Sequence, residues 1–135
     1  MNTLDAAIYS RLSSASAITS LLSSSTAIYS GQAPEKAIYP YIVFNIQGGG
    51  DINQTPHRTK NLVLFIRVYS NVSKYVAGQI DAAIDTALHL SPLSGVTGFT
   101  NTWFAREQEL ETVENPPTGG RIFMQGGLYR SRLAQ

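Results

Sequence analysis

The stretch LVLFIRVY, residues 62–69, decides the fold. Successive side chains of a strand point to opposite faces, so this stretch places two apolar sets back to back. One face carries Leu62, Leu64, Ile66 and Val68, and the other carries Val63, Phe65, Arg67 and Tyr69. We therefore expect a central strand that is covered on both sides, in part by another subunit.

Three further strands are expected on either side of this stretch. Pro40 opens a run rich in β-branched and aromatic residues, YIVFNI at 41–46, and the glycines at 48–50 end it. The polar residues 51–60 then form a long loop or the flexible tip of a hairpin. Residues 102–113 predict a third strand. Residues 121–133 predict a fourth, with a bulge at Gly126-Gly127.

Two main helices are expected. Asn2 or Thr3 can cap the first, whose apolar residues follow helical spacing to Ala15. The serine-rich residues 13–25 continue or break this helix before a loop. Asn71 or Ser73 caps the second, whose apolar stripe runs to about residue 88 before Pro92.

The predicted order is helix, two strands, helix, two strands. Short connections favour antiparallel pairing, with the helices on one face of the sheet. We therefore expect an α+β protein, a single domain over residues 1–135, with a mostly antiparallel four-stranded sheet and two main helices packed on one face.

Composition excludes several classes of function. The chain of 135 residues has a formal net charge of +1, too little for a field that holds nucleic acid. It contains no cysteine, so it has no disulfide framework and no thiolate chemistry. No apolar run approaches the roughly 18 residues of a membrane span. We expect a cytosolic product that stays soluble or enters an assembly made in the cytosol.

No catalytic, cofactor-binding or metal site is expected. His57 and His89 have no neighbours at metal-ligand spacing, and a zinc site needs three or four ligands. The glycines at 48–50 follow a strand but lack the Gly-Lys-Ser/Thr ending of a phosphate-binding loop. No Gly-x-Ser-x-Gly elbow is present, so the protein is predicted not to be an enzyme.

Two charged groups are candidate contact sites. Glu107, Glu109 and Glu111 alternate and are expected to share one face of a strand. They can lie opposite Arg121, Arg130 and Arg132 on the fourth strand or on a neighbouring subunit, or face the channel of a ring. The other group, His57, Arg58 and Lys60, belongs either to a solvated loop or to a loop that docks a partner.

Several phrases resemble the tail completion or tail terminator proteins of tailed bacteriophages. The opening LDAAIYSRL at 4–12 is similar to that family's first helix, and AIY at 27–29 with QAP at 32–34 resembles its next segment. PYIVF at 40–44 is similar to its most recognisable strand. Residues 64–69, with a helix directly after them, resemble a later strand and helix.

The resemblance implies a homohexameric ring in the virion tail or neck, assembled in the host cytoplasm. Such a ring caps the head-proximal end of the tail tube, ends its polymerisation and contacts neck or head-completion proteins. DNA would pass through it without specific contacts, and no membrane would be involved. By analogy, residues 48–60 and 115–120 are candidate docking loops, with Gly48, Gly49, Gly50, Asp51, His57, Arg58, Lys60, Asn115 and Thr118 as their contact residues.

Other functions remain open on the sequence alone. Within the same class, the chain fits a head-side adaptor or stopper, or a minor tail protein. From a different class, it fits a monomeric module that binds a small ligand in a concave apolar pocket.

Overall fold

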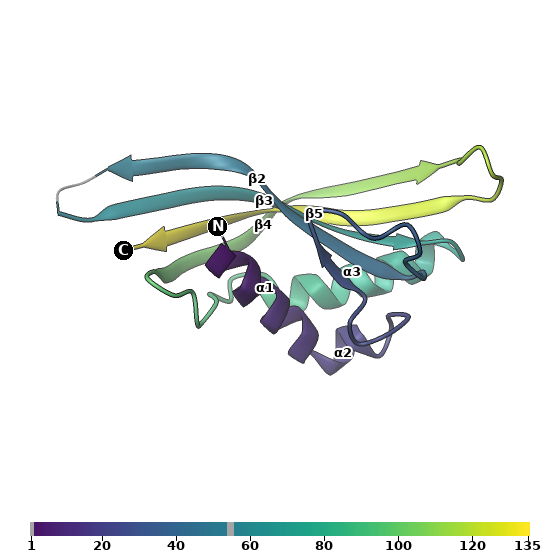
Figure 1. Cartoon of the computed structure of the whole chain (residues 1–135), viewed down its shortest axis with the longest axis horizontal. Coiled ribbons are helices and arrows are strands. Elements are labelled where there is room, and N and C mark those ends of the chain that lie inside the picture. The colour runs from purple at the N-terminus through teal and green to yellow at the C-terminus, as the bar shows by residue number, and fades with distance from the viewer. Residues whose placement is uncertain (1, 54–55) are drawn as a thin grey trace.

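The computed structural model describes residues 2–53 and 56–135. Its strands form one sheet, and the helices pack against one face of that sheet (Figure 1). The strands are β1 (Ile28–Ser30), β2 (Tyr41–Asn53), β3 (Arg58–Ser70), β4 (Thr100–Glu114) and β5 (Ile122–Ala134). The helices are α1 (Asn2–Ser14), α2 (Ser16–Thr19) and α3 (Lys74–Leu88).

The predicted four-stranded, mostly antiparallel sheet is wrong. The sheet is mixed and has five strands in the order β1-β2-β3-β5-β4. The additional strand, β1, runs parallel to β2, with Ile28 opposite Ile42. Three residues are too few to show the alternation that predicts a strand, so the sequence pattern does not reveal β1. The α+β class still describes the chain.

The glycines at 48–50 do not end a strand. They lie inside β2, which continues to Asn53 and pairs with β3 through Arg58. A register shift between Ile46 and Gly48 marks a bulge in β2. Of the two interpretations of residues 51–60, the hairpin is correct, and most of these residues belong to its strands. Residues 54 and 55 lie outside the described part.

The predicted bulge at Gly126-Gly127 is also wrong. The register between β5 and both of its neighbours runs through these two glycines. A Cβ atom on Gly126 would collide with the Ile66 carbonyl oxygen, and one on Gly127 with the Arg106 guanidinium. These glycines therefore allow a close approach of β3 and of an arginine. The shifts that involve β4 occur near Thr102 and Glu107 instead.

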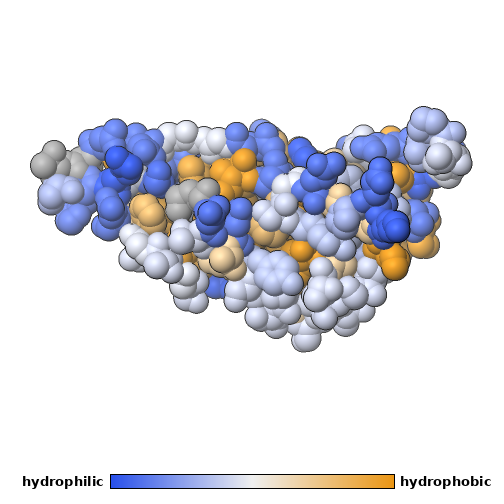
Figure 2. All heavy atoms as spheres, viewed as in Figure 1, coloured by the Kyte–Doolittle hydropathy of each residue, from blue (hydrophilic) through white to orange (hydrophobic). Residues whose placement is uncertain are grey.

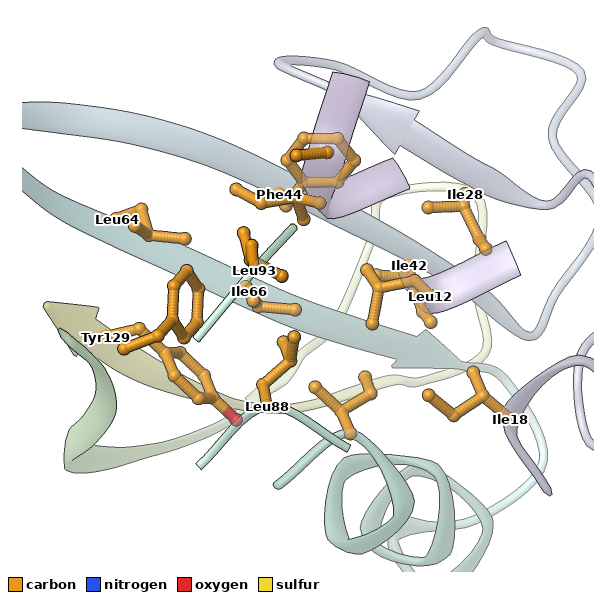
Figure 3. Close-up of a cluster of buried hydrophobic side chains, with 14 of the residues drawn as sticks. Leu12, Ile18, Ile28, Ile42, Phe44, Leu64, Ile66, Leu88, Leu93 and Tyr129 are labelled. Carbon is orange, nitrogen blue, oxygen red and sulfur yellow. The ribbon is translucent and has the colours of Figure 1, made fainter. Parts of the chain in front are cut away.

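The core lies between the helices and one face of the sheet. The alternating set Leu62, Leu64, Ile66 and Val68 of β3 points into it, with exposed fractions of 8% or less. Aliphatic side chains of α1 and α3 cover them at helical spacing, and Tyr129 of β5 joins them (Figure 3). The second face of β3 is half-buried, and none of the helices in the described part of the chain lies over it (Figure 1). Within the described residues, no helix is long and apolar enough to cross a membrane.

Local side-chain bonds fix both ends of α3. The Ser73 hydroxyl accepts a hydrogen bond from the Val76 backbone N–H at 3.2 Å, as the capping prediction required. At the other end, the Arg11 guanidinium of α1 donates to the carbonyl oxygens of Ala87 and Pro92 at 3.1 and 3.0 Å. Arg11 thus ties α1 to the last turn of α3 and the loop after it.

Candidate assembly surfaces

Two hairpins extend from opposite ends of the sheet (Figure 1). We define the β2–β3 arm as residues 46–53 with 58–63, and the β4–β5 arm as residues 107–125. Figure 2 shows mostly hydrophilic residues over the β2–β3 arm, at the left of the view. Strands of 13 and 15 residues are more than twice the usual length, so both arms extend past the layer of helices.

Each arm carries a free strand edge. On β2, the short strand β1 covers only Ile42 to Phe44, and no other strand of the described residues lies along the edge at 46–53. On β4, the first half is closed by two hydrogen bonds: Leu90 N–H donates to the Phe104 carbonyl oxygen at 2.7 Å, and Arg106 N–H donates to His89 Nδ1 at 3.1 Å. In the described part of the chain, the backbone of 107–114 pairs only with β5.

The candidate contact residues of the first loop lie on the β2–β3 arm. Gly48, Gly49, Gly50 and Asp51 belong to β2, Arg58 and Lys60 to β3, and His57 is exposed just before β3. Lys60 Nζ lies 3.1 Å from Asp51 Oδ1, and Arg58 Nε lies 3.8 Å from Asp51 Oδ2. The basic group is therefore partly neutralised by an aspartate that faces it across the hairpin.

The three glutamates of β4 do not share one face. A bulge between Arg106 and Gln108 makes Glu107 an extra residue, so its side chain joins the helix-free face and contacts Arg130. Glu111 lies on the helix side, where it forms an ion pair with Lys74 of α3. The alternation rule fails here because it assumes a strand without bulges.

The three arginines have three different surroundings. Arg130 Nε donates to Glu107 Oε1 at 2.8 Å, a contact across β4 and β5 that is one of the arrangements left open by the sequence. The Arg132 guanidinium lies 5.7 Å from the centre of the Trp103 ring. Arg121 is exposed just before β5, beside the turn at 115–120 that also holds exposed Asn115 and Thr118.

A buried polar cluster joins β4 to α3. The Arg106 guanidinium donates to the Asp81 carboxylate, and both side chains are only 10% exposed. Burial raises the pKa of the Asp81 carboxyl above its ordinary value, and the hydrogen bond from Arg106 offsets part of this rise. Arg106 also lies over the Tyr129 ring, 5.4 Å from its centre. No spacing pattern in the sequence indicates this cluster, because its members are far apart along the chain.

The cluster links the outer strand β4 to helix α3. Its charged atoms are enclosed between helix and sheet, where they hold the first half of β4 in place. In the ranges 2–53 and 56–135, no three His, Cys, Asp or Glu side chains come together to hold a metal ion.

A groove of about 620 Å³ runs along α3, lined by Lys74, Tyr75, Gly78, Gln79, Ala82 and Gln125.

The helix-free face of the sheet carries aromatic and apolar side chains. Tyr41 stands between Tyr39 and Tyr69, with ring centres 5.0 and 5.5 Å away. Arg67 lies over the Phe65 ring at 4.6 Å. That another subunit covers part of this face remains a prediction.

The fold is that of a small α+β protein with one mixed five-stranded sheet. Its distinctive features are long strand edges and projecting hairpins, which are suited to contacts with other chains.

The chain belongs to the family described as Tail completion protein gp17, whose model matches residues 6–121. The resemblance seen in the sequence is therefore confirmed, and the protein has a structural, tail-related role in a virion. No curated protein matches the chain at a significant level.

Solved structures share the fold. A chain from "Virion of native gene transfer agent (GTA) particle" superposes with a TM-score of 0.80 at 16% identity, over 98% of this chain and 95% of that one. A second solved chain has a TM-score of 0.61 at 17% identity, over 99% of this chain and 94% of its own. At these identities, the likeness is one of fold.

Proposed function

We propose that the protein assembles into a ring at the head-proximal end of the tail tube, where it ends tube polymerisation and joins the tail to the neck. The observation that carries this function is membership of a tail completion family over residues 6–121, in a chain with a free edge on each side of its sheet. It acts as one domain, without enzymatic activity.

The position of the two free edges supports a ring. They lie on opposite sides of the sheet, so a contact between them joins one surface of a copy to a different surface of the next copy. Such heterologous contacts form a closed ring when the rotation between copies completes a circle. The neck and tube partners would meet the two faces of the ring, and the turn at 115–120 is our candidate for one of these contacts.

A direct test compares tails assembled with and without the protein. With it, native mass spectrometry of the protein mixed with tail tubes should show a ring, and electron micrographs should show that ring at one tube end. Without it, tubes should be longer than normal and should not join heads. A protein that stays monomeric beside tube ends, with normal tails in its absence, would contradict the function.

The small-ligand module has weaker support. The apolar groove along α3 is its candidate pocket, but it lies open on the surface beside Lys74 and Gln79 rather than enclosing a ligand. The family match favours the structural role.

A further inference from the structure

We propose that neighbouring copies of this chain pair strand to strand, with the free edge of β2 at 46–53 in one copy against the free edge of β4 at 107–114 in the next. Because this pairing presupposes the ring proposed above, it names the surface that closes that ring. The partner at both edges is a second copy of this chain.

The length and exposure of the edges are the first argument. Residues 47–53 are all exposed, and so are all residues of 107–114 except the half-buried Leu110. Long exposed edges present unpaired N–H and C=O groups, and proteins normally cover or interrupt them. At 48–50, three consecutive glycines leave these groups without side chains to screen them from an incoming strand.

Strand directions agree with the pairing. β2, β3, β5 and β4 alternate in direction along the sheet, so β4 runs antiparallel to β2 of the same chain. A second copy placed beside the first, with its helices on the same side, therefore offers its β2 antiparallel to β4. The sheet then continues from one copy to the next, with the helices on the same face in every copy.

The charges favour pairing of β4 with β2 over pairing of β4 with another β4. The free half of β4 carries Glu107, Glu109, Glu111 and Glu114. Two such edges placed together would oppose glutamates to glutamates, which destabilises cross-strand pairs. In the β2–β3 arm, Arg58 and Lys60 of the adjacent strand β3 outnumber Asp51, the acidic residue of the β2 edge itself. An acidic edge therefore meets an arm with excess positive charge.

Disulfide trapping tests the pairing directly, because the natural chain contains no cysteine. Ile52→Cys is combined in turn with Gln108→Cys, Leu110→Cys and Thr112→Cys, three positions on the helix-free face of β4. Ile52 is level with Thr100, at the far end of β4 and three strands away, so no bridge can form within one chain. The matched control combines Ile52→Cys with Thr102→Cys, in the covered half of β4.

Mild oxidation of the assembled protein, alone and on tail tubes, should give a ladder of covalent multimers for at least one of the three pairs and none for the control. In the natural chain, amide hydrogens of 46–53 and 107–114 should exchange more slowly in the ring than in the monomer. Rings without cross-links or added protection would overturn the edge pairing and leave the proposed function standing. Cross-linked open chains that never cap tubes would support the pairing and refute the ring function.

Discussion

The Arg106 guanidinium of β4 donates a hydrogen bond to the Asp81 carboxylate of α3, and each side chain is 10% exposed. This contact connects the outer strand of the sheet to the helix beneath it. It lies where β4 changes from a closed edge to a free one, just before the bulge at Glu107. The cluster therefore anchors the strand from which the β4–β5 arm projects.

Asp81→Ala should destabilise the fold by about 3–5 kcal/mol, because it leaves the Arg106 charge buried without its main partner. Chemical denaturation measures the loss. Asp85→Ala is the matched control on the same helix: Asp85 lies 4.0 Å from Arg106 Nε and is 41% exposed, so its loss should cost less than about 1 kcal/mol. Equal losses for the two variants would contradict the assigned pairing.

Arg11→Ala should destabilise the protein by about 1–2 kcal/mol, since it removes charge-assisted hydrogen bonds to the end of α3. Arg11→Lys should restore only part of this loss, because one ammonium group cannot reproduce the guanidinium's bonds to two separate carbonyl oxygens. Thermal unfolding of the two variants beside the natural chain measures the difference. Full rescue by lysine would show that only the charge matters.

Gly126→Ala should destabilise the fold by at least about 1–3 kcal/mol, because its Cβ atom would collide with the Ile66 carbonyl oxygen of the neighbouring strand. Gly50→Ala is the control within the same sheet. A Cβ atom at Gly50 meets nothing within 4 Å, so this variant should retain its stability to within about 1 kcal/mol. Urea denaturation of both variants checks the contrast.

Much of the architecture could be predicted from short-range patterns. The alternation at 62–69 gave the central strand, and the Ser73 cap with its apolar stripe gave α3. β1 was missed because a three-residue strand has no visible period. Glu107 was placed on the wrong face because a bulge leaves no mark in the residue pattern.

The polar contacts of the arms and of the buried cluster were less accessible from the sequence. The Glu107–Arg130 pair was one of several arrangements that opposite charges on adjacent strands allowed. The Asp81–Arg106 pair forms because β4 passes over α3 in the folded chain. No spacing rule predicts which strand lies over a given helix. The free edges depend on the order of the strands in the sheet. This order was the part of the fold that could be predicted least well from the sequence.

Tyr129→Phe should leave stability unchanged or raise it slightly. The Tyr129 hydroxyl is buried near Arg106 but forms no hydrogen bond within the described residues, so its removal leaves no partner unsatisfied. Burial raises the pKa of Tyr129 well above its ordinary value. The folded state therefore resists ionisation of this phenol, and its stability should fall as the pH rises above about 10, where the unfolded chain ionises.

Alkaline unfolding, followed by circular dichroism, checks this sign. Between pH 9 and about 11, the natural chain should lose more stability than the Tyr129→Phe variant, which lacks the phenol. Tyr41, whose pKa is also raised by burial and by the neighbouring Tyr39, remains in both proteins and contributes equally. Identical pH profiles would show that Tyr129 ionises in the folded protein as readily as in the unfolded chain.

Glu109→Lys should weaken assembly without affecting the fold. Glu109 is exposed on the free half of β4, and reversing its charge opposes the excess positive charge of a neighbour's β2–β3 arm. Because a cross-strand charge pair contributes about 0.2–1 kcal/mol, the concentration needed for ring formation should rise by up to about fivefold. Native mass spectrometry over a dilution series measures this shift.

Arg58→Glu, a charge reversal on the opposite arm, should weaken assembly in the same way, because the two acidic arms then repel each other. Combining both substitutions in one chain restores unlike charges across the contact, so the ring should form nearer to its natural concentration. Glu35→Lys, the same charge change on the exposed loop between β1 and β2, serves as the control and should leave assembly unchanged. If the double variant assembles no better than either single variant, the charges of the two arms do not interact between copies, and the ring closes through other residues.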